Sequence, residues 1–460
     1  MDTIAAIATG SAPTAIGVIR VSGPETDSVV NRVFRPKCAR PFSGLEPRRL
    51  FLGALTDRMG RTLDSGMAVR FPAPASYTGE DCAELHCHGS PAAMGEILSA
   101  LFAAGARQAR PGEFTRRAFL NGKLELTQAE AVIDLIDAQT PAAARNAAAQ
   151  LDGALGRTVG QVYDELTALA SQFYAVVDYP DEDIEDLDRA KLEDTLRRAD
   201  GTLTRLLDTC GRGRVLRQGV PTAIVGLPNA GKSSLLNALA GYDRAIVTSV
   251  PGTTRDTVEE SVLCGGVLLR LTDTAGIRET DDAVERLGVE RSRSAARRAE
   301  LVLAVADGSA PLSPENKAVF ALAARCPRWV LVWSKADLAA DPQPAKSWTP
   351  PPGLSAPAAE VAVSSVTGEG LDRLENAVRA LFPAGEAPAG QILTNARQSE
   401  AVSRARDAVR RALEALECGM TPDVILTDAE EAMNALGELT GRTAREDIVS
   451  DIFSRFCVGK

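Results

Sequence analysis

The chain has 460 residues, of which 45% are hydrophobic and 24% charged, an ordinary composition for a globular protein of about three domains. Its formal net charge of −10 argues against broad non-specific binding of nucleic acid but permits a local basic patch. No apolar run is long enough to span a membrane, no basic region precedes the first apolar run, and the eight cysteines form no C-x-x-C pair. We therefore expect a cytoplasmic protein with reduced thiols and no membrane span.

Residues 1–121 alternate short β-type runs with helical segments, which predicts an α/β or α+β domain. One predicted strand would place Cys82, Glu84, His86 and His88 on the same face. This group raises the question of a zinc site, but no second ligand pair at zinc spacing occurs elsewhere in the sequence. We favour a strand whose polar face lines a pocket or an edge.

The pattern becomes helical over 122–217. Thr127 to Glu130 has the form of a capping box, and Thr140-Pro141 predicts an N-cap followed by the first residue of a longer helix. Apolar residues then recur every three or four positions from Leu151 to Val176, which predicts one long stripe facing the core.

Region 218–385 begins with a phosphate-binding pattern. Gly226 to Ser234 fits G-x-x-x-x-G-K-[ST] between an apolar run and a helical stretch, where backbone N–H groups and the helix N-terminus can bind phosphate. Lys232 would reach the β- and γ-phosphates, and the Ser233 hydroxyl would bind Mg²⁺. Later apolar runs alternate with helical segments, which predicts a doubly wound sheet with its ligand at the carboxyl ends of the strands.

Two further motifs indicate a guanine nucleotide. The DxxG sequence beginning at Asp273 would reach Mg²⁺ through water and contact the γ-phosphate through the Gly276 N–H. Ser334 to Asp337 occupies the place of NKxD, where a carboxylate accepts from two guanine N–H groups and cannot pair in this way with adenine. Because Ser334 replaces the usual asparagine, we expect lower nucleotide affinity with specificity kept.

The hydrolytic group is not in its usual place. Ile277 follows DTAG where Ras-like proteins have a water-orienting glutamine, so this group must come from elsewhere. Thr254 is the predicted second Mg²⁺ ligand beside Ser233. The predicted GTP-binding residues are Asn229, Ala230, Gly231, Lys232, Ser233, Ser234, Thr248, Ser249, Val250, Pro251, Gly252, Thr253, Thr254, Asp273, Thr274, Ala275, Gly276, Ser334, Lys335, Ala336, Asp337, Ser364, Ser365 and Val366.

Helices are predicted again over 386–460, where Thr443 to Glu446 forms a second capping box. Helices on both sides of the α/β region indicate one helical domain into which the nucleotide domain is inserted. With such an insertion, movement driven by the nucleotide could reorient the helical halves.

Four segments in this order resemble the MnmE (TrmE) family of tRNA-modification GTPases: GLPNAGKSSLLNAL, RAIVTSVPGTTRD, DTAGIRETDDAVERLGVERS and the C-terminal FCVGK. The resemblance covers essentially the whole chain and implies a multidomain fold. An α/β folate-binding-like and dimerisation domain (1–121) would precede an all-α helical domain (122–217 and 386–460). A P-loop α/β, Ras-like G domain (218–385) would be inserted in the latter.

The resemblance also implies how GTP is hydrolysed. Asn229 would bind K⁺ together with backbone carbonyls at Thr248, Val250 and Thr253, in the place of an arginine finger. The ion would become effective when two nucleotide domains dimerise. Glu285 would orient the attacking water.

Further implications concern the modification reaction. A tetrahydrofolate such as 5-formyltetrahydrofolate would be the one-carbon donor, held by Arg20, Glu84, Lys123 and Lys460. Cys457 is a candidate nucleophile or a buried small residue. The implied partners are a second copy of the chain, an MnmG-like flavoprotein in a heterotetramer, and tRNA, whose wobble uridine would receive a carboxymethylaminomethyl group at C5.

Two alternatives compete with this function. A ribosome-assembly switch of the Era or Der type would carry a KH domain after the nucleotide domain or a second P-loop, whereas one P-loop followed by helices is found here. An ATPase is disfavoured by Asp337.

Overall fold

The computed structural model describes residues 2–10, 12–38, 40–178, 188–242, 260–271, 294–339, 350–383, 387–443 and 446–459. The chain divides into two compact units. The first comprises Met1–Ile133, Gln150–Asp200 and Arg404–Lys460, and the second comprises Asp134–Ala149 and Gly201–Ser403.

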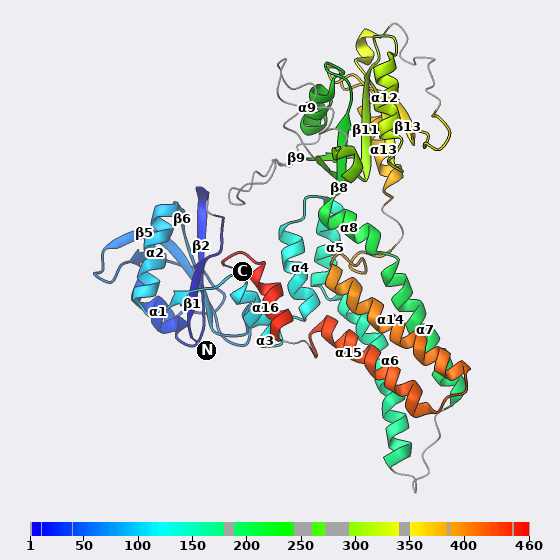
Figure 1. The fold of residues 1–460 in the computed structure, drawn as a ribbon. Coiled ribbons are helices and arrows are strands. Elements are labelled where there is room, and N and C mark those ends of the chain that lie inside the picture. Colours follow the sequence, from blue (N-terminus) through cyan, green and yellow to red (C-terminus); the bar gives the residue numbers. More distant parts are fainter. Residues whose placement is uncertain are drawn as a thin grey trace. The chain divides into compact units, whose positions relative to one another are not determined.

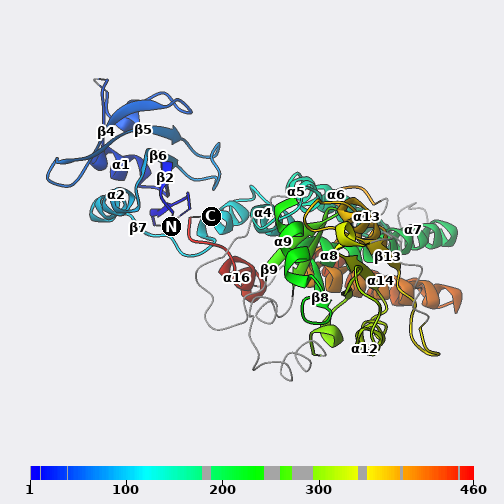
Figure 2. The same ribbon diagram turned by 90° about the horizontal axis from the view of Figure 1, so that it is seen from above.

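The first unit contains a seven-stranded sheet in the order β3-β4-β5-β6-β2-β1-β7. Only the pairing of β1 with β7 is parallel. The helices α1 (Thr26–Val33) and α2 (Pro91–Ala103) lie on one face (Figures 1 and 2), where Ile19 and Leu85 of the sheet pack in the same core as Ile97. The strands are β1 Ile4–Ile7, β2 Thr14–Ser22, β3 Phe34–Pro36, β4 Phe51–Thr56, β5 Thr62–Phe71, β6 Cys82–Gly89 and β7 Arg107–Gln108.

The predicted strand with four polar residues on one face is β6. Ala83, Leu85 and Cys87 are buried in the core beneath the helices, so the alternate residues Glu84 and His86 lie on the opposite face, where they are only half-buried. Burial raises the pKa of the Cys87 thiol to about 11. The half-buried Glu84 and His86 lie where they can make polar contacts.

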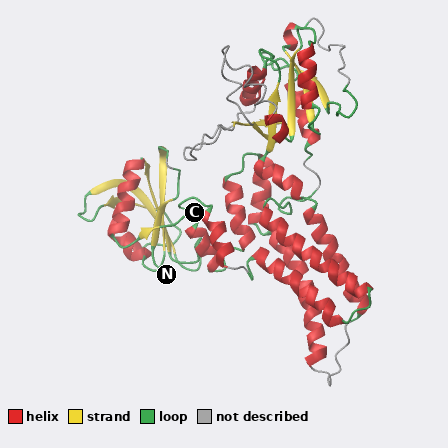
Figure 3. Ribbon diagram, viewed as in Figure 1, coloured by secondary structure: helices red, strands yellow, loops and turns green. Residues whose placement is uncertain are grey.

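Helices form the remainder of the first unit (red in Figure 3). The helix α15 packs along α6, and α16 packs against α3 through a cluster that includes Leu126 and Phe453. The helices are α3 Glu113–Leu120, α4 Leu126–Ile136, α6 Ala154–Asp178, α7 Arg189–Leu207, α14 Ala396–Glu417, α15 Pro422–Thr440 and α16 Glu446–Ser454. Some of these helices continue into the second unit.

The capping box predicted at Thr127 is wrong. Thr127 lies inside α4, and the Gln128 side chain instead accepts a hydrogen bond from the Glu125 N–H at 2.9 Å. The helix therefore begins earlier than predicted. The backbone N–H of Glu125, just before the helix, is paired with a side chain from the first turn of α4. The second predicted box, Thr443 to Glu446, lies partly outside the described residues.

The predicted cap at Thr140 is confirmed, but the helix it opens is shorter than predicted. The Thr140 hydroxyl accepts from the Ala143 N–H at 3.0 Å and opens α5 (Pro141–Leu151). Gly153 then adopts φ +85°, which ends the helix, and α6 begins at Ala154. The apolar stripe continues across this break, so periodicity alone did not reveal it.

The second unit contains the predicted doubly wound sheet, in the order β13-β12-β11-β8-β10-β9. All neighbouring strands are parallel except β9 and β10. The strands are β8 Val220–Val225, β9 Glu260–Cys264, β10 Val267–Leu271, β11 Leu301–Asp307, β12 Trp329–Ser334 and β13 Ala359–Ala362, and the associated helices are α8 Cys210–Gln218, α9 Lys232–Tyr242, α12 Pro314–Ala323 and α13 Leu371–Leu381.

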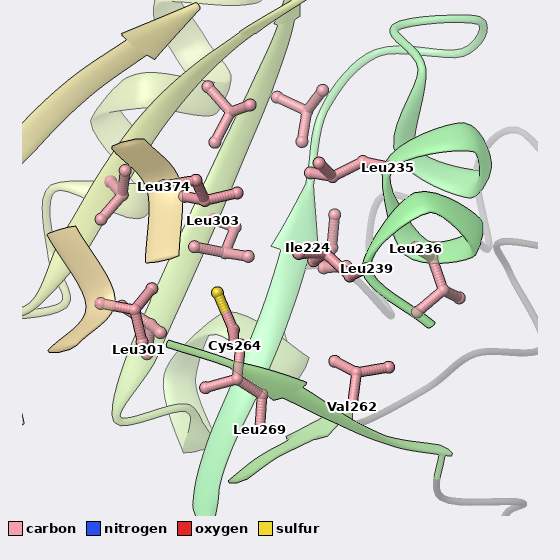
Figure 4. Packing of buried hydrophobic residues seen from close by; sticks show 14 of the residues in the cluster. Ile224, Leu235, Leu236, Leu239, Val262, Cys264, Leu269, Leu301, Leu303 and Leu374 are labelled. Atoms are coloured by element: carbon pink, nitrogen blue, oxygen red, sulfur yellow. The ribbon is translucent and has the colours of Figure 1, made fainter. Parts of the chain in front are cut away.

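Both faces of this sheet are buried. Figure 4 shows one core, in which Leu235 and Leu239 of α9 approach Ile224 of β8. On the other face Phe320 of α12 packs in the core that contains Trp329. Two covered faces leave the strand ends as the place for a ligand.

Among the described residues, no helix has both the length and the apolarity needed to cross a membrane.

Candidate functional site

The phosphate-binding loop joins β8 to α9 at the carboxyl edge of the sheet. A Cβ added at Gly226 would lie 2.4 Å from the carbonyl oxygen of Val305 in β11, so the close approach of the two strands requires glycine. Asn229 and Gly231 have φ of +59° and +90°, which curls the loop. Because β11 and β10 flank β8 on opposite sides, the loop lies where chain connections diverge to the two halves of the sheet.

Lys232 points back into this loop. Its Nζ donates to the carbonyl oxygens of Gly226 at 3.0 Å and Leu227 at 2.8 Å. Burial lowers the pKa of Lys232. An ammonium group held over the loop at a helix N-terminus fits the phosphates of a nucleotide.

Ser334 ties the phosphate loop to the loop predicted to bind guanine. Its buried Oγ lies 2.6 Å from the carbonyl oxygen of Ala230 and 3.1 Å from that of Ala306. The side chain is shorter than the usual asparagine, yet it still reaches the phosphate loop. A hydroxyl has one proton for these two acceptors, whereas an amide has two, so the expectation of lower affinity stays a prediction.

The predicted base-reading carboxylate is positioned by a side chain from the next strand end. The fully buried Ser364 donates from its Oγ to Asp337 Oδ1 at 2.7 Å. This contact fixes one carboxylate oxygen and orients the group, as recognition of two N–H groups on a base edge requires. Val366 is 86% exposed, so the described structure gives it no packing role.

Asp307 is a residue near the site that the sequence motifs did not indicate. It ends β11, and its Oδ2 lies 2.6 Å from Nζ of Lys335, which has φ +56°. Burial raises the pKa of Asp307, but hydrogen bonds from Lys335 and Ser309 outweigh this effect and lower it overall. The signal was a carboxylate directly after a continuous apolar run.

Several predicted residues lie outside the described ranges, so the structure does not place them. They are Thr248, Ser249, Val250, Pro251, Gly252, Thr253, Thr254, Asp273, Thr274, Ala275, Gly276, Ile277, Glu285 and Lys460.

In the first unit, the structure brings together two of the predicted folate-binding residues. Arg20 of β2 donates from Nε and Nη2 to Glu84 Oε1 of β6, at 3.1 and 2.9 Å. The guanidinium carbon of Arg20 also lies 5.1 Å from the ring centre of Tyr77 and 5.7 Å from that of Phe114. The result is a half-buried charged pair bordered by aromatic rings.

Lys123 and Cys457 are held by other contacts. Lys123 Nζ donates to the Pro74 carbonyl at 3.2 Å, which ties it to the loop that carries Tyr77. Cys457 is exposed, which excludes the alternative of a buried small residue, and its carbonyl oxygen accepts from the Gly112 N–H at 3.3 Å.

The C-terminal segment approaches the strand next to Arg20. A Cβ at Gly459 would lie 2.2 Å from the carbonyl oxygen of Ile7, and the preceding residue of β1, Ala6, pairs with Arg20. Gly459 therefore lies beside β1, the neighbour of the strand that carries Arg20.

In the part of the chain that the structure describes, no group of three or more His, Cys, Asp or Glu side chains is placed so that it could hold a metal ion. Glu84 pairs with Arg20, and His88 Nδ1 lies 2.8 Å from Asp64 Oδ1. Glu84 and His88 on the polar face of β6 are thus engaged with other side chains.

An acidic and basic cluster joins the N-terminus to α3 beside this site. Arg107 and Arg117 both contact Asp2 and Glu113. Burial alone would raise the pKa of Glu113, but hydrogen bonds from Arg107, the Arg110 backbone and Arg117 lower it to about 2, and Arg107 lowers that of Asp2 to about 2.

We expect Glu113→Gln to destabilise the protein by about 2–3 kcal/mol at neutral pH. Because the folded pKa of Glu113 lies below its ordinary value of 4.5, this contribution is complete above about pH 5 and is lost as the pH falls toward 2. Urea unfolding of both proteins between pH 6 and 3 should show the difference in unfolding free energy at least halved at pH 3. A constant difference would contradict the role of ionised Glu113.

Comparison with known proteins provides the deciding observation. The model of the MnmE helical domain matches residues 126–457, and that of the GTP-binding protein TrmE N-terminus matches residues 3–123. The tRNA modification GTPases MnmE of Heliobacterium modesticaldum and Symbiobacterium thermophilum are each 43% identical, covering 100% of this chain and 99% of theirs. The chain belongs to the MnmE family of tRNA modification GTPases.

The match confirms three predictions made from the sequence: the family, the multidomain fold class and the GTPase activity. A crystal structure of Era from Aquifex aeolicus is 27% identical and covers 41% of this chain and 65% of that chain. Its TM-score is 0.26, too low to support a structural inference.

Proposed function

We propose that this chain is a K⁺-dependent GTPase that acts in the cytoplasm with an MnmG-like flavoprotein. Together they would add a carboxymethylaminomethyl group at C5 of the wobble uridine of certain tRNAs, with a tetrahydrofolate as one-carbon donor. The observation that carries the proposal is the single hydroxyl of Ser334 joining the phosphate loop to the base-reading loop. In a chain of the MnmE family, this contact would hold together the two ends of the proposed guanine nucleotide site at one edge of the sheet.

The residues of the loop suit GTP and its ions. Lys232 holds a positive charge over the loop, and Ser233, at the start of α9, offers a hydroxyl to Mg²⁺. Asn229 is exposed on the loop with its backbone in the left-handed region, so its side-chain oxygen is accessible to a K⁺ ion. A bound K⁺ would supply positive charge where negative charge develops on the transferred phosphoryl group.

Glu285 is the proposed group that orients the attacking water, because Ile277 has no polar atom in its side chain for this task. The two nucleotide domains of a homodimer would come together for turnover. Thr248, Val250 and Thr253 would complete the K⁺ site through backbone carbonyls, and Thr254 would complete the Mg²⁺ site.

The charged pair in the first unit supports the folate part of the proposal. Arg20 and Glu84 offer a donor and an acceptor beside Tyr77, a combination that fits the polar edge and flat ring of a pterin. Lys123 and Lys460 would bind the carboxylates of the folate tail. Bound folate would supply the one-carbon unit, and Cys457, exposed on the C-terminal segment, is the proposed nucleophile.

We expect GTP turnover to be at least tenfold faster in KCl than in NaCl at the same ionic strength, since the proposed site selects K⁺. Glu285→Ala should bind GTP normally and lose most of the K⁺-stimulated turnover, and Asn229→Ala should lose the K⁺ stimulation, both measured as phosphate release. Equal rates in the two salts would remove the K⁺ mechanism and the role of Asn229.

The tRNA part is tested separately, by nucleoside analysis of tRNA from a deletion strain. Loss of the modified wobble uridine, restored by the wild-type chain, is the expected result. Normal modification in the deletion strain would contradict the proposal and leave a GTPase switch of the Era or Der type as the alternative.

A further inference from the structure

The chain returns from the nucleotide domain to the helices through residues 387–394, called here the return segment. Its backbone groups are held by buried side chains distant in sequence. Asn146 of α5, which is 2% exposed, accepts at Oδ1 from the Gly390 N–H at 2.8 Å and donates from Nδ2 to the Ile392 carbonyl at 3.4 Å. One amide side chain therefore satisfies a donor and an acceptor two residues apart, as a neighbouring strand would.

The next residues of the return segment are held in the same way. The Leu393 N–H donates to Thr209 Oγ1 at 3.0 Å, and the Thr394 hydroxyl donates to Asp134 Oδ2 at 2.8 Å. A Cβ at Gly213 would lie 1.8 Å from the Leu393 carbonyl oxygen, so α8 contacts the segment directly. We call Asp134, Asn146 and Thr209, with the return segment, the seam.

The helix α8 connects the seam to the nucleotide sheet. The two terminal nitrogens of the Arg214 guanidinium donate to the two carboxylate oxygens of Glu300, the residue before β11. Val215 packs against the core beneath α9, and a Cβ at Gly219 would lie 2.8 Å from the carbonyl oxygen of Leu268 in β10. The strand β10 ends at Leu271, just before the DxxG motif proposed to contact the γ-phosphate.

The last turn of α8 also joins the seam. Arg217 Nε lies 3.1 Å from Asp134 Oδ1, and the Asp134 side chain is only 8% exposed. The carboxylate of Asp134 therefore bridges α8 and the return segment. Because the Asp134 carboxylate is buried, separating it from its partners is costly, which favours movement of the whole assembly over rupture at the seam.

We propose that the seam makes residues 134–149, α8 and the return segment one rigid body with the nucleotide domain. This body is the lever that carries the nucleotide state to the rest of the chain. The proposal rests on the proposed function, since the lever links GTP hydrolysis to tRNA modification. It agrees with the second compact unit, which contains these residues in addition to the nucleotide domain.

The first test separates turnover from coupling. Asn146→Leu removes both hydrogen bonds at similar side-chain size, and Arg145→Ala changes an exposed neighbour on the same helix. We expect Asn146→Leu to keep GTP turnover within about twofold of wild type, because no proposed catalytic group is touched, and to lower wobble modification in the complemented strain at least tenfold. Arg145→Ala should preserve both. Full modification by Asn146→Leu, with faster amide exchange at residues 390–393, would overturn the proposal.

The second test needs no destabilising variant. Arg145→Cys on α5 and Lys317→Cys on α12 place two spin labels on exposed positions of the proposed rigid body, in full-length chain with Cys38, Cys418 and Cys457 replaced by serine. Diluted with unlabelled chain, the sample should give one distance at the same position with GDP and with GDP–aluminium fluoride. A distance that changes with the nucleotide would show that the seam yields. Failure of the proposed function is distinguishable, because wild type would then lack GTP turnover or fail to restore modification.

Discussion

Replacing Asp337 by asparagine should lower GTP affinity by about 10²–10³-fold and create affinity for xanthosine triphosphate. The carboxylate would accept two guanine N–H groups, and hydrogen bonds to a charged group contribute about 1.5–3 kcal/mol each. An asparagine amide can instead donate to the 2-carbonyl of xanthine. The new side chain should stay in place, since its amide oxygen can still accept from the Ser364 hydroxyl at the position where the Asp337 carboxylate does now.

This expected result is measured as dissociation constants for the two nucleotides. Glu369→Gln is the matched control, because it removes one exposed negative charge close to Ser364 without changing the base-reading group. The control should bind GTP as wild type does. An Asp337→Asn protein that retains wild-type preference for GTP would remove Asp337 as the guanine reader.

The second large effect is expected from Gly226→Ala. The added Cβ would lie 2.4 Å from the Val305 carbonyl oxygen, and both groups belong to backbone that is fixed in the sheet. Either β8 and β11 separate or the phosphate loop shifts. We expect a loss of about 1–3 kcal/mol in unfolding free energy, together with loss of measurable GTP binding.

Gly241→Ala is its control. Gly241 lies exposed in the last turn of α9, and a Cβ there would have no heavy atom within 4 Å. Alanine should stabilise this helix by up to about 1 kcal/mol and leave GTP binding unchanged. Denaturant unfolding and nucleotide titration of both variants test the pair. Wild-type stability and binding in Gly226→Ala would show that the two strands are not packed as described.

The sequence alone determined the chemistry of the nucleotide site. The phosphate loop and the segment that contains Asp337, the predicted guanine reader, are contiguous motifs, so their residue types and spacing are readable without coordinates. The doubly wound sheet was also predictable, because strands covered on both faces appear as continuous apolar runs. The prediction of a capping box at Thr127 was wrong. Both Glu125 to Gln128 and Thr127 to Glu130 have residue types that can begin a helix, and the local sequence does not distinguish between them.

Only the tertiary structure decided which distant residues meet. Three contacts join positions far apart in the chain: the hydrogen bond of Ser334 to Ala230, the ion pair of Arg20 with Glu84, and the hydrogen bond between Asn146 and Gly390. Each pair forms because folding buries a polar or charged group that has no hydrogen-bond partner near it in the sequence. The order of residues along the chain does not show which distant group becomes that partner. The sequence therefore determined what the nucleotide site is, and the fold decided which residues hold it together and connect it to the helices.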